Sequence, residues 1–485
     1  MKNHKAETGP FFIKSKHKKR RRTMEQKRNS LYLFGITLVA AIGGLLFGYD
    51  TAVISGAEES LKAYLIDSLH LGPFIHGATI SSALIGCIIG GIISGYFASK
   101  FGRKNSLIMA AILFLISSLG AAYPEFLFFS KGHPTIGLLI AFNIYRIIGG
   151  IGVGLASAVC PMYIGEVAPA DVRGRLVSFN QFMIILGMLV AYFVNFSISH
   201  GQTQSWVNDV GWRYMFASCG VPALLFGLLL LTVPETPRYL SLKNQDDKAL
   251  RILTKINGTK AAKLILGQIK QTVNDSSGKL FTYGKTVIVI GILLSVFQQF
   301  VGINVALYYA PRIFESMGAG KDASMMQTTI MGLVNVVFTV VAIVTVDKWG
   351  RKPLLIVGSI GMAIGMFGVA GMAFKEVIGM GTLIFIIVYT ASFMMSWGPI
   401  CWVLISEIFP NKIRGRAVAI AVAAQWAANY LISSTYPAMM DYSGAVTYGF
   451  YGLMSVLSAI FVWKFVPETK GKTLEEMEGT WNKIA

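Results

Sequence analysis

The sequence predicts an all-α integral membrane protein, with twelve transmembrane helices in two homologous halves of six. Three observations support this fold class. First, 54% of the 485 residues are hydrophobic and only 14% are charged, whereas soluble globular chains carry about 25% charged residues. Second, apolar segments of bilayer-spanning length recur along the chain. Third, several short motifs occur twice, in the same order. These observations exclude a soluble fold, a disordered chain and a small disulfide-linked scaffold.

Twelve apolar segments approach or exceed the ~20 residues that cross the hydrocarbon core of a bilayer. A segment inside the bilayer has no water to satisfy its backbone, so each segment is expected to be a helix. The alternating pattern of β-barrel strands does not occur in them. The predicted spans are 31–56, 77–98, 105–124, 136–158, 176–197, 213–233, 286–311, 325–346, 353–373, 381–405, 417–440 and 446–466.

Basic residues predict which side of the membrane each loop faces. If both termini are cytoplasmic, the inner segments hold most of the 43 Lys and Arg residues, as cytoplasmic loops generally do. We therefore expect a multi-pass protein of the cytoplasmic (inner) membrane with both termini inside. The expected divisions are a basic tail at 1–30, a first half at 31–233, a cytoplasmic central loop at 234–285, a second half at 286–466 and a tail at 467–485.

The remaining compositional features predict few partners beyond the lipid bilayer. The basic run at 14–23 directly precedes a span, which favours contact with anionic lipid over a nucleic-acid partner. The four cysteines lie singly in apolar spans without metal-ligand spacing. The histidines are assigned to tails or loops, so we expect no metal, no cofactor and no membrane-embedded histidine relay. We expect a monomer. The histidines are His4, His17, His70, His76, His133 and His200.

Three motifs of the first half return in the second half, which predicts a duplication. Residues 99–104 return at 347–352, residues 166–175 at 407–416, and Pro-Glu-Thr at 234–236 returns at 467–469. Acidic and basic side chains at inner helix ends can pair across neighbouring helices and latch one conformation. The predicted inner-face gating residues are Glu166, Arg173, Glu407, Arg414, Arg103, Arg351 and Asp347.

Six motifs together resemble the sugar-porter family of the major facilitator superfamily. They are Gly43–Asp50, Arg146–Gly154, Pro234–Arg238, Gln298–Asn304, Trp397–Pro399 and Pro467–Gly471. The likeness runs from about residue 31 to 478. It implies the major facilitator fold and proton-coupled uptake of a neutral monosaccharide by alternating access, with D-xylose as the first choice. The alternative is proton-coupled or facilitative transport of glucose or another aldose.

Uncharged amides inside the spans predict a site for a neutral polyol. An amide offers a donor and an acceptor, as a sugar hydroxyl does, whereas phosphate or carboxylate substrates favour Arg or Lys. The resemblance implies sugar contact for five amides and for Trp397, and aromatic rings can cover the C–H face of a sugar. The candidates are Gln181, Gln298, Gln299, Asn304, Gln425, Trp397, Phe47, Tyr308, Trp426 and Asn335. Holding helices together is the alternative role for Asn335.

The spacing of two of these amides predicts a break in their helix. At about 100° per residue, Gln298 and Asn304 lie on different faces of a straight helix. Transporters commonly use discontinuous helices at the binding site. We therefore expect irregular backbone at 302–304.

Asp50 and Arg146 are the only ionisable residues well inside the predicted spans. A charge at the bilayer centre is costly and usually functional. We expect the two side chains to pair and to couple a proton to transport. The resemblance supports this role, because proton-coupled sugar porters carry an aspartate at this position. A fixed structural ion pair is the alternative.

Other function classes find little support in the sequence. The glycines at 150, 152 and 154 lie within an apolar span and not at a strand-to-helix turn, so they do not predict nucleotide binding. A phosphate loop ending at Lys285 would need glycine at position 279, which is Lys279. We therefore expect no enzymatic activity. A transporter-like sugar sensor is the less favoured alternative, because neither the central loop nor the C-terminal tail resembles a signalling domain.

Overall fold

The computed structural model describes residues 29–126, 128–169, 172–273, 284–316, 318, 320–375, 380–410 and 413–470. These residues form helices and no β-strand. Twelve helical stretches among them are long and apolar enough to cross a membrane, which confirms the predicted fold class. The stretches are Ser30–Leu69, Ser82–Phe101, Arg103–Ala122, Ile136–Val167, Arg173–Ser199, Gln204–Thr232, Thr286–Tyr308, Lys321–Val346, Arg351–Phe374, Gly381–Ile405, Arg416–Tyr442 and Gly444–Phe465.

The first six stretches form the first bundle and the last six form the second bundle. The first bundle contains α2 (Ser30–Leu61), α3 (Pro73–Ile80), α4 (Ser82–Phe101), α5 (Arg103–Ala122), α6 (Ile136–Val167), α7 (Arg173–Ser199), α8 (Gln204–Trp206), α9 (Trp212–Ser218) and α10 (Gly220–Thr232), with η1 (Lys62–Ile66), η2 (Asp67–Leu69) and η3 (Val207–Gly211). The second bundle contains α14 (Thr286–Phe300), α15 (Ile303–Tyr308), α16 (Ala310–Ser316), α17 (Lys321–Trp349), α18 (Arg351–Phe374), α19 (Met380–Met394), α20 (Trp397–Ile408), α21 (Arg414–Tyr442) and α22 (Gly444–Phe465).

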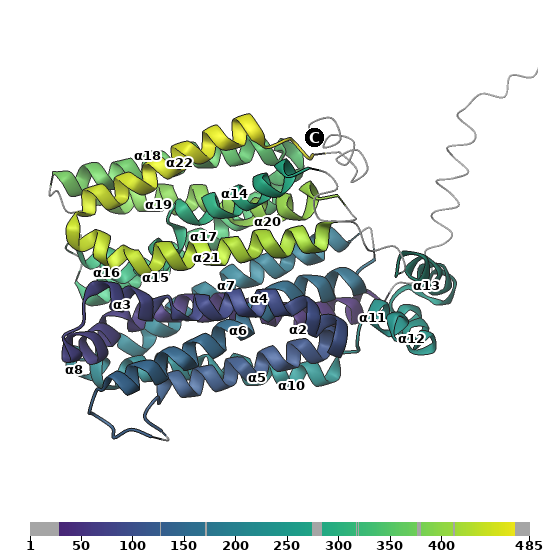
Figure 1. Ribbon diagram of the computed structural model, residues 1–485, viewed down its shortest axis with the longest axis horizontal. Helices are drawn as coiled ribbons and strands as arrows, with labels where there is room; N and C mark the ends of the chain where they lie inside the picture. Colours follow the sequence, from purple (N-terminus) through teal and green to yellow (C-terminus); the bar gives the residue numbers. More distant parts are fainter. Residues whose placement is uncertain are drawn as a thin grey trace, which may run out of the picture.

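The two bundles lie side by side, with three short helices at one end of the molecule (Figure 1). These are α11 (Pro237–Leu242), α12 (Asp246–Asn257) and α13 (Thr259–Val273). We call their end the inner end, and the opposite end, where α3, α8 and α16 lie, the outer end. The segment that contains α11–α13 was expected to be a loop. Ala249, Leu253 and Ile256 recur at helical spacing and form a buried face of α12, which explains its helical structure.

Glycines allow close helix contact inside the first bundle. A Cβ atom on Gly150 of α6 would lie 1.8 Å from the Ala83 carbonyl oxygen of α4, and one on Gly86 of α4 would lie 2.0 Å from the Ile147 carbonyl oxygen. Only glycine permits backbones to approach so closely in this interface. The glycines of the 150–154 motif therefore serve helix packing.

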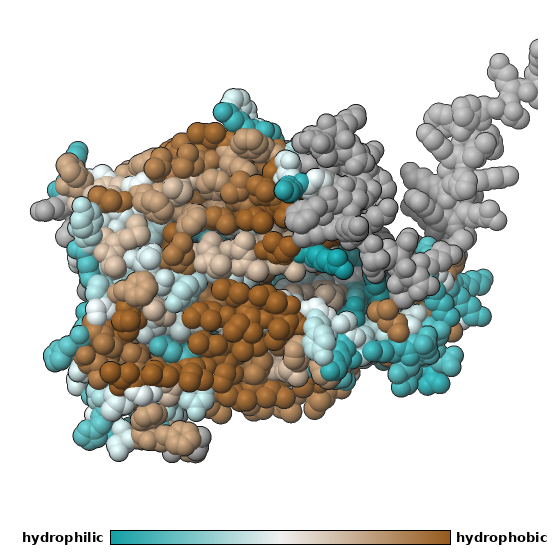
Figure 2. All heavy atoms as spheres, viewed as in Figure 1, coloured by the Kyte–Doolittle hydropathy of each residue, from teal (hydrophilic) through white to brown (hydrophobic). Residues whose placement is uncertain are grey.

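The outward faces of the spanning helices are apolar. Leu224, Leu228 and Leu231 of α10 are each at least half exposed. Figure 2 shows hydrophobic residues over the middle of the visible face and hydrophilic residues concentrated toward the ends, including the region of α11–α13. Such a wide exposed apolar surface matches contact with lipid chains.

One histidine lies elsewhere than the sequence predicted. His76 is 1% exposed and belongs to α3, a helix that begins directly at Pro73, where proline is favoured. The expectation that every histidine lies in a tail or loop is therefore wrong. The helix α3 packs against α21 of the second bundle, which buries the imidazole between the bundles.

Candidate functional site

A cavity lies between the two bundles and encloses about 590 Å³, including space open to solvent. Helices α2 and α7 line it from the first bundle, and α14, α15, α19, α20 and α21 line it from the second. The lining residues are Phe47, Thr51, Gln181, Ile184, Ile185, Met188, Gln298, Gln299, Ile303, Asn304, Leu307, Tyr308, Phe393, Met394, Gly398, Trp402, Gln425 and Trp426.

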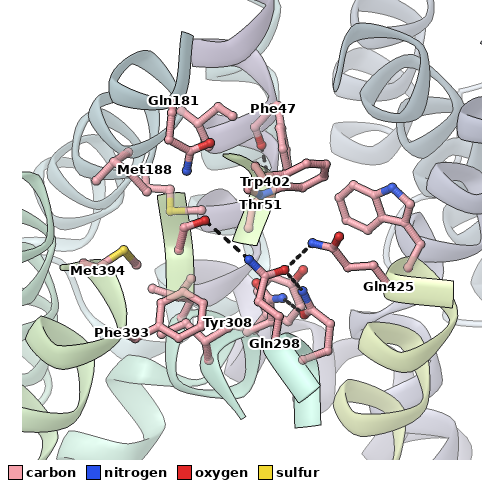
Figure 3. A pocket seen from close by; sticks show the side chains of 18 residues that line it. Phe47, Thr51, Gln181, Met188, Gln298, Tyr308, Phe393, Met394, Trp402 and Gln425 are labelled. Atoms are coloured by element: carbon pink, nitrogen blue, oxygen red, sulfur yellow. Dashed lines mark hydrogen bonds between the residues drawn. The ribbon is translucent and has the colours of Figure 1, made fainter. Parts of the chain in front are cut away.

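Four amide side chains of the second bundle form a hydrogen-bond network on one wall of this cavity (Figure 3). Gln298 Nε2 donates to the Trp397 carbonyl at 2.9 Å. Gln298 Oε1 accepts from Gln425 and, at 3.2 Å, from Gln299. Asn304 Nδ2 donates to Gln299 Oε1 at 2.5 Å. The network fixes the orientation of each amide, so the remaining donor and acceptor atoms face a ligand in a defined arrangement.

Two buried polar atoms in the cavity wall lack a hydrogen-bond partner within the described residues. They are Gln425 Oε1 and Trp426 Nε1. A buried polar atom without a partner costs about 1–3 kcal/mol, and a hydroxyl can serve either atom because it both donates and accepts. Gln181 of α7 lies across the cavity from Gln298 (Figure 3). The polar groups therefore converge from both bundles on one space.

The predicted break in the helix is confirmed and explains how these amides share one cavity. α14 ends at Phe300 and α15 begins at Ile303, with Gly302 between them at φ +91°. L side chains rarely adopt this conformation, and a Cβ atom on Gly302 would also lie 2.8 Å from the Tyr451 ring. The change of direction at Gly302 lets both Gln298 and Asn304 line the cavity.

The predicted aromatic residues Phe47, Tyr308 and Trp426 line the cavity, whereas Trp397 does not. The Trp397 indole is fully buried and donates to Ser359 Oγ at 2.7 Å. The structure places Trp402 in the wall instead. Trp402 lies five residues further along α20, and the sequence pattern does not single it out, because only Trp397 belongs to the Trp-Gly-Pro motif.

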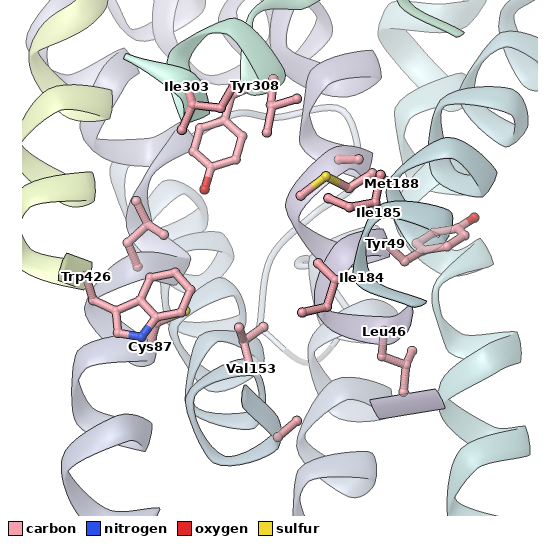
Figure 4. Close-up of a cluster of buried hydrophobic side chains, with 14 of the residues drawn as sticks. Leu46, Tyr49, Cys87, Val153, Ile184, Ile185, Met188, Ile303, Tyr308 and Trp426 are labelled. Carbon is pink, nitrogen blue, oxygen red and sulfur yellow. The ribbon is translucent and has the colours of Figure 1, made fainter. Parts of the chain in front are cut away.

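Asn335, the remaining predicted sugar contact, also lies outside the cavity wall. It is buried in α17, and neither atom of its amide has a hydrogen-bond partner within the described residues. Apart from the hydroxyl groups of Thr51 and Tyr308, the rest of the wall is apolar. Figure 4 shows Tyr308 on one side of the site, and Ile184, Ile185 and Met188 of α7 across from it. These side chains can contact the C–H faces of a ring whose hydroxyls bind the amides.

A second, smaller cavity holds the expected ion pair. Asp50 Oδ1 lies 2.7 Å from Arg146 Nη1, and both side chains are more than nine-tenths buried. Arg146 Nε has no hydrogen-bond partner within the described residues, and the guanidinium lies over the Phe216 ring at 5.3 Å. No group of three or more His, Cys, Asp or Glu residues in the described ranges is placed to hold a metal ion.

The two cavities share part of their walls. Thr51, Tyr308 and Trp426 line both the amide-rich cavity and the cavity that contains Asp50 and Arg146. Thr51 is the sequence neighbour of Asp50 on α2. A ligand that moves these three side chains therefore also changes the surroundings of the ion pair.

At the inner end, the repeated motifs form the same arrangement once in each bundle. Arg103 Nη2 pairs with Glu166 Oε1 at 2.7 Å in the first bundle, and Thr236 Oγ1 donates to the same carboxylate at 2.6 Å. In the second bundle, Arg351 pairs with Glu407 at 3.0 Å. The corresponding threonine, Thr469, donates to the Glu407 carboxylate at 2.6 Å.

A glycine precedes each of these arginines and allows a carboxylate to cap the following helix. Gly102 and Gly350 share φ +94°. Glu235 accepts the backbone N–H of Arg103 at 3.1 Å, and Glu468 accepts that of Arg351 at 3.0 Å. These carboxylates satisfy the N–H groups at the starts of α5 and α18. The Pro-Glu-Thr repeat is visible in the sequence, but the partners of its Glu and Thr depend on the fold.

The other predicted gating residues do not form described ion pairs. Arg173 Nη2 donates to the Ala168 carbonyl at 3.4 Å, and Glu166 pairs with Arg103. The side chains of Asp347 and Arg414 lie outside the described part of the structure. Their gating role therefore stays a prediction.

Comparisons with known proteins agree with this architecture. A family model described as "Sugar (and other) transporter" matches residues 36–481. The chain is 53% identical over 480 residues to the D-xylose-proton symporter of Escherichia coli (strain K12), covering 94% of this chain and 97% of the relative. It is 42% identical to the arabinose-proton symporter of Bacillus subtilis, covering 92% and 95%. It is 40% identical to the glucose facilitated diffusion protein of Zymomonas mobilis, covering 92% and 97%.

Solved structures give the same result for the fold. The inward open conformation of the xylose transporter XylE from E. coli matches with a TM-score of 0.84 and 53% identity, covering 93% of this chain and 100% of that chain. The proton:xylose symporter XylE bound to 6-bromo-6-deoxy-D-glucose matches with a TM-score of 0.81 and 53% identity, with the same coverage.

Proposed function

This chain belongs to the sugar-porter family of the major facilitator superfamily, and we propose that it takes up D-xylose together with a proton by alternating access. Among its relatives are proton symporters for two pentoses, D-xylose and arabinose. The relatives are transporters and not enzymes. An uncharged, amide-rich cavity between two bundles suits a neutral monosaccharide.

The observation that carries the proposal is the shared wall between the two cavities. Thr51, Tyr308 and Trp426 contact both the space for a sugar and the space around Asp50 and Arg146. Symport requires that sugar occupancy and proton occupancy influence each other. These three side chains supply a direct physical route for that influence, without a chain of distant residues.

The ion pair has the chemistry that proton coupling needs. Asp50 and Arg146 carry opposite charges and meet at a buried contact of 2.7 Å. A proton on Asp50 removes the charge that Arg146 pairs with, which weakens the contact between α2 and α6. A bound sugar contacts Tyr308 and Trp426, which form part of the wall between the sugar and the ion pair. Uptake follows when both ligands favour the same change in the packing of the bundles.

The proton gradient supplies enough free energy for accumulation. One proton that moves inward across 100 mV releases about 2.3 kcal/mol. Each unit of pH gradient adds about 1.4 kcal/mol. Together these terms support a sugar gradient of roughly a few hundredfold, because about 1.4 kcal/mol corresponds to a factor of ten.

The family and the twelve spanning helices indicate a multi-pass protein of the bacterial inner membrane. We further infer that both described ends face the cytoplasm. The Asn29 backbone N–H donates to the Ile256 carbonyl of α12 at 3.3 Å, and Lys470 Nζ donates to the Lys348 carbonyl at 2.6 Å. Both contacts lie at the inner end, where the basic repeated motifs also occur, and basic loops are typically cytoplasmic.

Glucose is the second candidate substrate. A glucose facilitated diffusion protein is among the relatives, and a solved structure of the xylose symporter holds a glucose derivative. Met188 and Met394 line part of the cavity wall, and thioethers offer little hydrogen bonding to a hydroxyl. This apolar wall favours a pentose that carries fewer hydroxyl groups.

Reconstitution into proteoliposomes tests the proposal. Addition of D-xylose outside de-energised vesicles should alkalinise the external medium as sugar and protons enter together. Sucrose serves as the control for solute addition without transport. Uptake of labelled xylose with no pH change would show facilitated diffusion. A parallel panel of pentoses and hexoses, compared as kcat/KM, identifies the preferred sugar.

A further inference from the structure

The ion pairs that join the two bundles have an uneven distribution. Within the described residues, those between the bundles lie at the outer end: Glu58–Arg312, Glu59–Lys321 and His200–Asp322. The described pairs at the inner end do not join the bundles: Arg103–Glu166 and Arg351–Glu407 stay within one bundle each, and Lys270–Asp246 joins α12 to α13. Within the described residues, ion pairs therefore join the two bundles at the outer end.

The pair between Glu58 and Arg312 differs from the others in its burial. Glu58 Oε1 lies 3.1 Å from Arg312 Nη1, and the Glu58 side chain is only 3% exposed. In the other two pairs every side chain is 27–61% exposed. Exposed pairs contribute little to a conformational equilibrium, whereas a buried carboxylate needs its partner. Most of the electrostatic attraction between the bundles at the outer end therefore comes from the pair of Glu58 and Arg312.

The surroundings of Glu58 hold the carboxylate at the interface. His76 Nε2 of α3 lies 3.1 Å from the same Glu58 oxygen, and the imidazole packs edge-on against Tyr309 of the second bundle at 6.3 Å. A Cβ atom on the neighbouring Gly77 would lie 2.1 Å from the Ser434 carbonyl oxygen of α21. The bundles thus touch backbone to backbone beside the pair, and opening this end must separate Glu58 from Arg312.

We propose that Glu58 and Arg312 form a latch across the outer end of the two bundles, whose strength sets how often the transporter opens to the outside. The latch rests on the proposed alternating access. When the outer end opens, water replaces Arg312 around Glu58, and the latch then closes again as the two bundles return.

Distances between spin labels at the outer end test the latch. Ser68 and Tyr442 are exposed, belong to different bundles and lie at the outer end. Ser68→Cys and Tyr442→Cys carry the labels, and the four native cysteines are buried. The measurement uses the full chain in lipid nanodiscs without sugar. Arg312→Gln should shift the distance distribution toward longer values and raise the ratio of open to closed outer ends about tenfold or more, because it removes the cation of the second bundle that pairs with the buried Glu58 carboxylate.

Matched variants separate the latch from general packing. Lys62 pairs with Asp67 at 3.2 Å on the same side of the molecule but within one bundle, so Lys62→Gln should leave the distances unchanged. Glu58→Gln should shift them as Arg312→Gln does, and the double variant should shift them no further than the larger single variant. Glu58→Gln also provides the test if Arg312→Gln does not fold.

Unchanged distances in folded Arg312→Gln or Glu58→Gln protein, or additive shifts in the double variant, would overturn the latch. The distances do not depend on transport. A lack of proton-coupled uptake in the wild type would therefore count against the proposed function alone, and unchanged distances would count against the latch alone.

Discussion

Asp50 Oδ1 accepts a hydrogen bond from Arg146 Nη1 at 2.7 Å, and the two side chains are 9% and 3% exposed. Arg146 Nε makes no hydrogen bond within the described residues, so one short contact holds the pair together. A pair held at a single contact can separate when one partner loses its charge. The pair lies beside the amide-rich cavity and shares three wall residues with it, and we propose that this position links protonation to transport.

Replacement of Asp50 tests the coupling step. Asp50→Asn removes the titrating group but keeps the size of the side chain, so uphill xylose accumulation should be lost while counterflow of labelled xylose continues. Asp67→Asn is the matched control, because Asp67 is an exposed aspartate near the outer end, and it should accumulate xylose as the wild type does. Accumulation at the wild-type level by Asp50→Asn would contradict the coupling role.

The two tryptophans of α20 should respond differently to substitution. Trp402 lines the cavity, so Trp402→Ala should weaken xylose binding by about tenfold or more through lost contact with the sugar ring. Trp397→Phe removes the hydrogen bond to Ser359 and should lower Tm with little change in Kd, since a buried hydrogen bond contributes about 1 kcal/mol. Calorimetric titration and thermal unfolding separate the two effects. A larger change in Kd for Trp397→Phe would favour Trp397 as the sugar contact.

The sequence predicted the fold because its signals are strong and local. Apolar length identifies spanning helices, and the wheel positions of Gln298 and Asn304 required a break near Gly302, which the structure contains. The sequence does not show which of the two tryptophans, Trp397 or Trp402, lines the cavity. The answer depends on how α20 is rotated after the irregular residue Ser396 (φ −135°, ψ −90°), and neighbouring helices set that rotation.

Charge pairing was predicted only in part, for a similar reason. The repeated motifs identified Arg103 and Glu166 as members of an inner-end set, and these two residues pair. Arg173 was expected in the same set, but among the described residues its side chain donates to the Ala168 carbonyl and forms no ion pair. His76 was assigned to a loop because the apolar pattern that predicts a span weakens near Pro73. Partners that come from distant helices depend on tertiary packing, which local patterns do not encode.

Gly302 provides a test of the predicted break. Gly302→Ala should lower Tm and weaken xylose binding, because a side chain at φ +91° is strained and its Cβ would meet the Tyr451 ring. Backbone strain of this kind costs about 1–3 kcal/mol. Gly449→Ala is the matched control, since nothing lies within 4 Å of the position that a Cβ atom would take there, and alanine favours helix by up to about 1 kcal/mol. If both variants bind xylose equally well, the break does not position Asn304.

The two capping glutamates at the inner end should differ in how they contribute to stability. Burial raises the pKa of Glu235 and outweighs the opposing backbone N–H bonds from Thr236, Lys104 and Arg103. Burial acts in the same direction on Glu468, but its backbone N–H bonds, led by that of Lys470, prevail and lower its pKa. The two carboxylates thus occupy matching positions and have opposite pKa shifts.

These shifts predict opposite dependences of stability on pH. Glu468 has a lowered pKa, so its contribution is present above the ordinary glutamate pKa and is lost as the pH falls through the lowered value. Glu235 has a raised pKa, so its contribution is present below the ordinary value and is lost as the pH rises through the raised one. At pH 7, Glu468→Gln should therefore lower Tm more than Glu235→Gln does. The difference in Tm between the two variants should narrow as the pH is lowered toward 4.5, the ordinary pKa of both carboxyls. Thermal unfolding of both variants across this pH range measures the two changes in Tm. A larger loss of Tm for Glu235→Gln than for Glu468→Gln at pH 7 would contradict the opposite pKa shifts.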